Sequence, residues 1–378
     1  MEKVNDNVLA EIKKLGAFDL EACYSCGTCS AICPLSKEDA SFPRRMIRYA
    51  MLGLEKRILA APEPWLCYYC GECSETCPRQ AEPAALMMAL RRFATRKYSL
   101  GRMADAIYSS LASVFTWLLL SAVALVLVLL AIDPGMNRRE FDFQSFIPLD
   151  PIHWAGLVLV GFIVLVAAIQ VWILYRNLRG GLPVRRDRDV GTQAVPPAGV
   201  AALKARQAGI SAWKALGESV VQKRFGECDD GQWRRLAHMA VSWGFMGMFL
   251  ATVIIGAVDF NWLHWPRWVS LVVGSVSGVA CSLGLGYYIY LRLAKKTALG
   301  RYSHPSDWVF LLLLALSVLS GFVIVGFRFL GLPMAAYATA VFHLVVVFDL
   351  LITLPFSKFA HVVYRPVALW FAGLKQVK

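Results

Sequence analysis

The run Cys23-Tyr-Ser-Cys26-Gly-Thr-Cys29-Ser-Ala-Ile-Cys33-Pro34 decides how the amino-terminal part of this chain folds. A near copy follows it, with the sequence Cys67-Tyr-Tyr-Cys70-Gly-Glu-Cys73-Ser-Glu-Thr-Cys77-Pro78. Both runs have the spacing C-x2-C-x2-C-x3-C-P, which is typical of ferredoxins that hold two [4Fe–4S] clusters. In such proteins the first three cysteines of a run bind one cluster and the fourth binds the other. We therefore predict one cluster on Cys23, Cys26, Cys29 and Cys77, and a second on Cys67, Cys70, Cys73 and Cys33.

Other uses of cysteine explain this pattern less well. Structural zinc also binds C-x2-C pairs, but a site with four ligands does not require the doubled spacing. Disulfides need an oxidising compartment, and the charged opening MEKVNDNVLAEIKK lacks the apolar core of a secretory signal. We therefore expect the cysteine runs to remain in the cytoplasm. Cys281 lies in an apolar run and is predicted to be a small core residue, whereas Cys228, in a charged stretch, has no interpretation.

The composition indicates a membrane protein whose first hundred residues are polar. The chain has 378 residues, 57% of them hydrophobic, and its mean hydropathy is +0.52. Six apolar runs are each about long enough to cross a ~30 Å hydrocarbon core as a helix. We place these spans near residues 107–132, 153–175, 236–258, 268–291, 307–329 and 336–357.

The charges between the spans predict the topology. Basic residues gather before span one, between spans two and three, between spans four and five, and after span six, and they include Arg96, Arg102, Arg185, Arg186, Arg188, Arg292 and Lys358. The other links are poor in basic residues. This alternation follows the positive-inside rule and predicts a multi-pass protein of the cell inner membrane, with both termini in the cytoplasm. The net charge of +13 therefore reflects topology or, around Arg185, a docking surface, and we expect no nucleic-acid partner.

Histidines in the spans predict haem. A polar side chain at membrane depth is costly and indicates function by default, and histidine is the usual ligand of haem iron in helical bundles. His343 and His361 would face one side of an ideal helix, about five turns apart, although Pro355 between them could kink it. His238 opens span three on the same side of the membrane as His361. We predict a haem b between His238 and His361.

A second haem b, on His343, is predicted with its other axial ligand left open. The alternatives are His153, which begins span two on the same side of the membrane, Met248 in span three, which is nearer in depth, and a single axial ligand. Met248 is better explained as a core residue. Asp349 in the middle of span six is equally well explained as a proton relay near haem or quinone and as a buried hydrogen-bonding group.

The amino-terminal part resembles the C subunit of heterodisulfide reductase. The similarity extends from the first cysteine run, through Phe42-Pro43-Arg44-Arg45-Met46-Ile47-Arg48, to Trp65-Leu66-Cys67. That family is similar to the mostly helical ferredoxin domain of succinate dehydrogenase and fumarate reductase. We accordingly expect a helix from Pro43 to Leu59 that Pro62 and Pro64 close.

The membrane part resembles the cytochrome b subunits of heterodisulfide reductase and the gamma subunit of respiratory nitrate reductase. The similarity lies in Leu236-Ala237-His238, in His343-Leu344, and in Leu354-Pro355-Phe356-Ser357-Lys358-Phe359-Ala360-His361. This family's fourth haem ligand would fall at Met248, where the chain departs from the pattern. The predicted fold is all-α: a helical ferredoxin domain with two [4Fe–4S] clusters over residues 1–100, followed by a six-helix transmembrane haem b bundle over residues 101–378.

The fusion of these two parts resembles the C subunit of the quinone-interacting membrane-bound oxidoreductase complexes. This resemblance implies menaquinone as substrate, soluble flavin- and iron–sulfur-containing partner subunits, and electron transfer with adenylylsulfate reductase in dissimilatory sulfur metabolism. Two alternatives remain open. One is a heterodisulfide reductase-like or sulfite-reduction electron-transfer subunit, and the other is a membrane anchor or assembly scaffold whose metal sites are structural.

Overall fold

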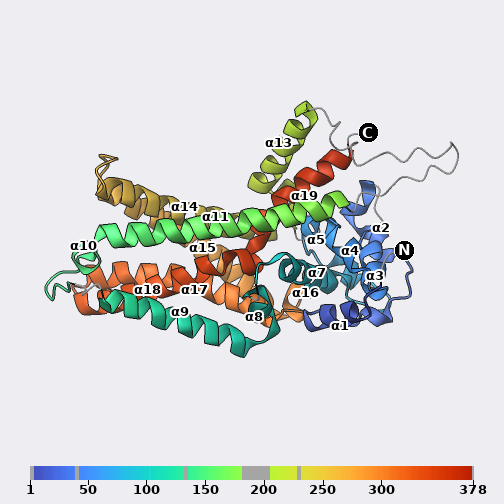
Figure 1. Cartoon of the computed structure of the whole chain (residues 1–378), viewed down its shortest axis with the longest axis horizontal. Coiled ribbons are helices and arrows are strands. Elements are labelled where there is room, and N and C mark those ends of the chain that lie inside the picture. Colours follow the sequence, from blue (N-terminus) through green and yellow to red (C-terminus); the bar gives the residue numbers. More distant parts are fainter. Residues whose placement is uncertain are drawn as a thin grey trace.

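The chain folds into an elongated helical molecule, with a bundle of long helices at one end and short helices packed around the cysteines at the other (Figure 1). The computed structural model describes residues 4–38, 42–101, 103–131, 135–180, 205–227 and 231–376. Within these ranges the regular secondary structure is helical and contains no strand, as the sequence predicted. Arg102, Arg185, Arg186, Arg188 and Cys228 lie outside the described residues.

Short helices surround one longer helix in the amino-terminal part. Helix α7 (Pro83–Tyr98) is buried along most of its length, because apolar residues from Leu86 to Phe93 meet neighbours on several sides. Helices α1, α3, α5 and α6 pack against it. The short helices are α1 (Asn7–Lys14), α2 (Thr28–Ile32), α3 (Arg44–Met51), α4 (Glu55–Leu59), α5 (Glu63–Leu66) and α6 (Glu72–Glu75).

The expected helix from Pro43 to Leu59 is two helices in the structure. Helix α3 ends at Met51 and α4 begins at Glu55. The backbone carbonyl of Gly53, between them, accepts a hydrogen bond of 3.1 Å from the amide of Asn5, so the break connects this region to the start of the chain. Pro62 and Pro64 do not simply end a helix, because the short helix α5 begins beside them.

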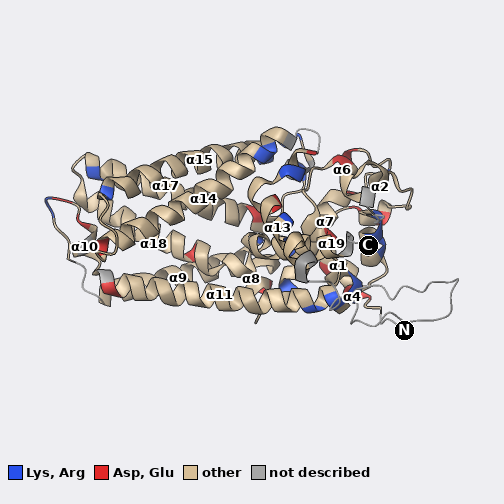
Figure 2. Ribbon diagram, turned by 90° about the horizontal axis from the view of Figure 1, so that it is seen from above, with Lys and Arg blue, Asp and Glu red and all other residues tan. Residues whose placement is uncertain are grey.

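Among the residues that the structure describes, six helices are long and apolar enough to cross a membrane, as the sequence predicted. Charged residues, coloured on the ribbon, are concentrated toward the two ends of these helices, and few lie between (Figure 2). Leu119, Leu127 and Leu130 on α9 are more than 60% exposed, as side chains facing lipid would be. The six are α9 (Leu111–Ala131), α11 (Leu149–Gly180), α14 (Gly231–Asp259), α15 (Arg267–Ala294), α17 (Pro305–Phe329) and α18 (Pro333–Ile352).

The end of the sixth span differs from the prediction. Helix α18 ends at Ile352, and two 3-10 turns, Leu354–Phe356 and Lys358–Ala360, separate it from a further helix, α19 (His361–Gln376). Pro355 favours the break, because proline has no N–H to donate to a helical carbonyl and disfavours the α conformation in the residue before it. His343 and His361 therefore lie on different helices, and the ideal-helix distance between them does not apply.

Helix α11 links the membrane bundle to the amino-terminal part. It has 32 residues, which gives a length of about 48 Å, well beyond a ~30 Å hydrocarbon core. Its last turns contact α4, α7 and α19. Leu174 and Leu178 are fully buried there, in a cluster with Trp65, Tyr98 and Tyr364. This cluster fixes the two parts of the molecule against each other.

Candidate functional site

The two cysteine runs fold into the same local structure. Gly27 and Gly71 adopt left-handed φ angles of 90° and 97° and cap helices α2 and α6 at their amino ends. Residues with a Cβ rarely adopt such angles. In each run the amide two residues after the first cysteine donates to that cysteine's Sγ, Ser25 to Cys23 at 3.4 Å and Tyr69 to Cys67 at 3.3 Å. Helices α2 and α6 pack side by side, which brings the runs together.

The four cysteines predicted to bind the second cluster lie around one space. Cys33, Cys67, Cys70 and Cys73 line one cavity, partly open to solvent, with about 540 Å³ free of atoms. No three His, Cys, Asp or Glu side chains form a site for a single metal ion in the part of the chain that the structure describes. The cavity is instead a wider space surrounded by four sulfurs.

The electrostatic neighbours of Cys29 and Cys33 come from the predicted sets, whereas Cys73 of the second set is also influenced by Cys29 of the first. Burial raises the pKa of the Cys29 thiol, and the nearby Cys23, Cys26 and Cys77 raise it further. Burial raises the pKa of Cys33 to about 12, with additional contributions from Cys67 and Cys70. Thiolates at these positions are therefore costly without a compensating cation, which iron would supply.

The second set, which lines the cavity, faces the membrane helices. Three arginines from three helices donate to backbone carbonyls of residues 67–70. Arg91 of α7 donates to the carbonyl of Cys67, and Arg365 of α19 reaches the same oxygen at 3.4 Å. Arg234 of α14 donates to Tyr69 at 2.6 Å and to Cys70 at 3.2 Å. The first set lies toward solvent, because Cys26 is exposed and Tyr24 beside it is 61% exposed.

An aromatic chain leads from this cysteine loop to the predicted histidine pair. Tyr68 packs edge-on against Phe225 with ring centroids 5.1 Å apart, and Phe225 lies 5.7 Å from the ring of His238. The rings of His238 and His361 are 6.2 Å apart between centroids. The two histidines, far apart in sequence, are thus neighbours.

Both imidazoles of this pair are oriented through Nδ1. The Nδ1 of His238 lies 2.8 Å from Oε1 of Gln222, and that of His361 lies 2.6 Å from the carbonyl oxygen of Lys358. With Nδ1 donating, Nε2 carries the lone pair in each ring. Burial lowers the pKa of His361 to about 3, and the neighbouring His238 lowers it further, so His361 is neutral.

The other predicted haem ligands contact residues outside the His238–His361 pair. The Nδ1 of His343 lies 2.8 Å from the hydroxyl of Ser320 in α17. His153 packs edge-on against Phe260 at the end of α14, with centroids 4.2 Å apart. Met248 packs against the buried core of the bundle, which also contains the fully buried Cys281. These contacts therefore do not join His343 to either alternative partner among the described residues.

Asp349 is buried in α18 and forms a hydrogen bond with a neighbouring helix. Its side chain is 3% exposed, and Oδ1 accepts from the hydroxyl of Ser121 in α9. The contact is the buried hydrogen bond that was one of the two sequence interpretations. A proton role for Asp349 remains a prediction.

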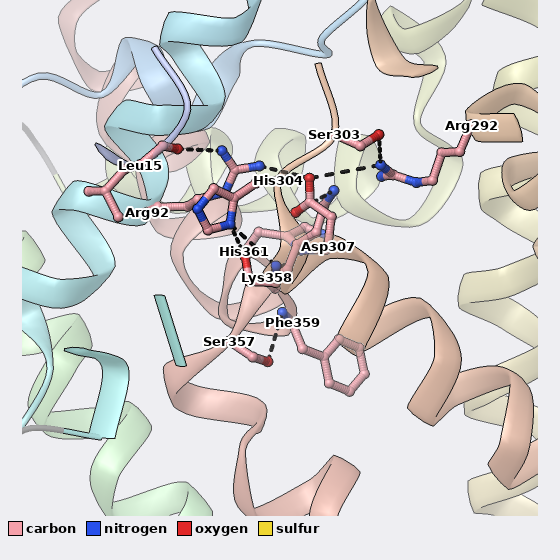
Figure 3. A network of polar contacts seen from close by, with 11 residues as sticks. Leu15, Arg92, Arg292, Ser303, His304, Asp307, Ser357, Lys358, Phe359 and His361 are labelled. Carbon is pink, nitrogen blue, oxygen red and sulfur yellow. Dashed lines mark hydrogen bonds and ion pairs between the residues drawn. The ribbon is translucent and has the colours of Figure 1, made fainter. Parts of the chain in front are cut away.

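Sequence reasoning missed a buried charge network that joins the two parts of the molecule (Figure 3). Asp307, in the first turn of α17, lies 2.7 Å from Arg92 of α7 and 3.2 Å from Lys358. Arg292 of α15 lies 3.9 Å from the same carboxylate. Lys358 also provides the carbonyl that orients His361. The sequence signal was an acidic residue at the start of a span, where it complements the helix dipole.

A second hollow lies on α3 and α4. Four arginines and a tyrosine contribute to its lining, together with two leucines, and no carboxylate does so among the described residues; the residues are Arg44, Arg45, Arg48, Tyr49, Leu52, Leu54 and Arg57. Arg44 approaches the backbone at Gly27, in the first cysteine run. The hollow is therefore a positively charged surface beside the solvent-facing cysteines.

Comparison with known proteins identifies the cysteine region. A 4Fe-4S dicluster domain matches residues 19–81. The chain is 39% identical over 94 residues to a protein of Archaeoglobus profundus that is named as similar to the C subunit of heterodisulfide reductase, and the match covers 25% of this chain and 50% of that protein. No solved structure matches the chain. The amino-terminal part is therefore an iron–sulfur segment similar to the C subunit of heterodisulfide reductase.

Two further relatives have different names. The second iron–sulfur C subunit of the CoB–CoM heterodisulfide reductase of Methanocaldococcus jannaschii is 32% identical over 114 residues, 28% of this chain and 59% of the relative. Citrate utilization protein B of Escherichia coli is 31% identical over 157 residues, 39% of this chain and 40% of the relative. The chain thus spans between 40% and 59% of the length of these three relatives.

Proposed function

We propose that the chain is the membrane subunit of a quinone-linked oxidoreductase, which relays electrons between menaquinol in the bilayer and soluble flavin- and iron–sulfur-containing subunits. The complex would serve adenylylsulfate reductase in dissimilatory sulfur metabolism. The observation that carries this proposal is the series of ring contacts from Tyr68, in the loop of Cys67 and Cys70, through Phe225 to His238 and His361. Both termini and the cysteines would lie on the cytoplasmic side.

The histidine pair would hold the iron of one haem. The ring centroids of His238 and His361 are 6.2 Å apart, so both rings could bind a single metal through Nε2. The Nδ1 contacts to Gln222 and Lys358 are the outer hydrogen bonds that orient ligating histidines. His238 and His361 would hold one haem b, and His343 a second.

The cysteine sets suit clusters in the same way. Four sulfurs around one cavity, together with Cys29 and the three cysteines that raise its pKa, would provide the thiolate ligands of two [4Fe–4S] clusters. Bound haem and clusters would supply one-electron chemistry. The chain's own residues hold them, exclude water through the buried cluster around Trp65 and Tyr364, and keep His361 neutral.

Other residues would serve the substrate and the partner. Asp349, buried and bound to Ser121, is our proposed group for accepting or releasing a proton of quinol. The hollow formed by Arg44, Arg48 and Arg57 would receive an acidic surface of a soluble subunit beside the solvent-facing cysteines. Mobile electron carriers of opposite charge associate faster by electrostatic attraction.

The proposal is tested by removing one predicted ligand at a time. H238A and H361A should each abolish the same low-spin haem b spectrum in purified protein while leaving the iron–sulfur signals. H264A, at an exposed histidine, is the matched control and should leave the spectrum intact. A protein with full wild-type cluster content and no reducible haem would contradict the proposal and favour a scaffold.

The cysteine assignment has its own test. C33S, a change in the first run, should remove the cluster of the second run. C77S, a change in the second run, should remove the cluster of the first run. Electron paramagnetic resonance of the reduced variants distinguishes the remaining clusters. If each serine removed the cluster of its own run, the crossed assignment would be wrong.

A heterodisulfide reductase-like subunit is the second candidate. The names of two relatives above favour it, because both refer to the C subunit of heterodisulfide reductase. The two candidates differ in the acceptor of the electrons. The purified complex is reduced with menaquinol and then offered adenylylsulfate reductase or a heterodisulfide. Electron transfer to adenylylsulfate reductase supports the first candidate, and transfer to the heterodisulfide supports the second.

A further inference from the structure

The segment that follows helix α13 (Ala205–Val221) lies between the cysteine loop and the histidine pair. It consists of Gln222 and the 3-10 helix η3 (Lys223–Glu227), after which α14 begins at Gly231. In the structure, Arg224 and Glu227 line the cavity of the second cysteine set, and Gln222 reaches His238.

Gln222 is held in an unusual conformation to make its contact. Its φ angle is 51°, in the left-handed region that residues with a Cβ rarely adopt, and its amide donates to the carbonyl of Glu218 at 2.8 Å. The side chain is buried, with Oε1 2.8 Å from Nδ1 of His238. Ser242 provides a longer contact of 3.3 Å to the same nitrogen. Backbone strain at a buried polar contact points to a functional constraint.

Phe225 connects the other side of this segment to the cysteine loop. Its ring lies between Tyr68 and His238, and the guanidinium of Arg234 lies 5.5 Å above it. Glu218 connects Tyr68 to the segment that contains Phe225. Its carboxylate accepts from the hydroxyl of Tyr68 and from the amide of Arg224 at 3.0 Å. Gln222 and Phe225 thus contact His238 and the cysteine loop as one unit.

We propose that Gln222 and Phe225 are positioning residues: they fix the tautomer and ring orientation of His238 and set the cysteine loop 67–70, rather than the first run, beside the histidine pair. This inference rests on the proposed function. With iron on Nε2, Nδ1 of His238 carries its proton and donates to Gln222. The order of sites is then His238–His361, the second cysteine set, the first cysteine set and the soluble partner.

The potential of the bound haem tests the role of Gln222. Q222L removes the acceptor, weakens electron donation by His238 and should raise the midpoint potential. Q222E strengthens the acceptor and should lower it, by up to about a tenfold change in the reduction equilibrium, 59 mV for one electron. Q170L is the control, because buried Gln170 accepts from Tyr364 at 2.8 Å and not from a histidine. The g-values of the ferric haem should change in Q222L and in Q222E but not in Q170L.

The outcomes separate this inference from the proposed function. A wild-type chain without haem ends the proposed function itself. If the haem potential is the same in Q222E as in the wild type, or if it shifts as far in Q170L as in Q222E, only the inference is overturned. Q222E keeps a polar group of the same size, so it decides the question even where Q222L fails to accumulate.

The order of sites has an independent test in the serine variants. After rapid reduction of the haem by menaquinol, C77S retains the second cysteine set, which should accept electrons at the wild-type rate. C33S retains only the first set, whose reduction should be slowed. The opposite result, with fast transfer in C33S and slow transfer in C77S, would overturn the order.

Discussion

Asp307 connects the amino-terminal part to the membrane helices through buried charges. Arg92, Arg292 and Lys358 surround its carboxylate, and the side chains of Asp307, Arg92 and Arg292 are about 6–7% exposed. Removing one partner of a buried pair leaves uncompensated charge and costs about 3–5 kcal/mol. We expect D307N to lose that much free energy of unfolding, as measured by thermal denaturation in detergent.

An exposed ion pair provides the control for D307N. Asp105 lies 2.5 Å from Arg96, and its side chain is 40% exposed. Exposed pairs contribute about 1 kcal/mol or less. A loss of stability in D105N equal to that in D307N would contradict the special role of the buried network.

His304 should make stability depend on pH. It begins α17 as the amino-terminal cap, and burial together with the positive charge of Arg92 lowers its pKa from 6.5 to about 4. Between these values the unfolded chain binds the proton that the folded chain excludes. Stability should therefore fall as the pH decreases from 6.5 to 4, and H304N should flatten this dependence. An unchanged slope in H304N would contradict the assignment.

Individual residues were predictable where their partners are close in sequence. The cysteine sets follow from spacing within two short runs. Asp307 and Arg92 are 215 residues apart, and no local pattern relates them. Gln222 was likewise missed, because its role depends on the position of His238 in a later helix. His238 and His361 were singled out as candidate haem ligands because a polar ring in or beside an apolar segment is conspicuous by itself.

At the level of elements, helices α14 and α15 approach each other closely at Gly244. A Cβ there would lie 2.6 Å from the carbonyl oxygen of Ser277 and 2.8 Å from Cys281. Small residues allow membrane helices this approach. G244A should destabilise the bundle by about 1–3 kcal/mol, because the extra methyl forces the helices apart.

Gly286 provides the comparison for G244A. It lies on α15 with nothing within 4 Å of the position of its Cβ. G286A should leave stability unchanged or raise it by up to about 1 kcal/mol, since alanine favours helix. Thermal unfolding of both variants in the same detergent checks the pair, and equal losses would show that Gly244 has no special packing role.

The elements themselves were predictable to different degrees. Long apolar runs identified all six spans, because length and hydropathy are local properties. The end of the sixth span was wrong, since apolar residues continue through Pro355 to Phe356 although the helix ends at Ile352. The break between α3 and α4 was also not predicted from the sequence, because it depends on the contact of Gly53 with the distant Asn5.

At the scale of the whole molecule, residues on the two sides of the domain boundary expected at residue 100 share one buried cluster. Trp65 and Tyr98 are 1–2% exposed because they pack on Tyr364, Leu174 and Leu178. A fragment of residues 1–100 would expose this surface. We expect the reconstituted fragment to bind hydrophobic dyes and to unfold at a lower temperature than the same region in the intact chain. Equal stability would contradict this prediction.

The charged hollow on α3 and α4 predicts how salt affects the assembled complex. Four arginines line it beside the first cysteine run. Electron transfer to the proposed soluble subunits should weaken as ionic strength rises, because salt screens exposed charges over about 10 Å. R48E should reduce the association rate and its dependence on salt. R179E, at an exposed arginine of α11 outside the hollow, is the control and should change neither.

The length of α11 has a consequence for the lipid environment. Because one continuous helix runs from the apolar bundle into the junction with α4, α7 and α19, the protein cannot adapt to a thinner or thicker bilayer by bending between its halves. Such a bilayer would tilt the molecule as a single body or deform around it. The orientation of the cysteine-bearing end relative to the membrane plane would then vary with lipid chain length, while the spacing between its internal sites would not.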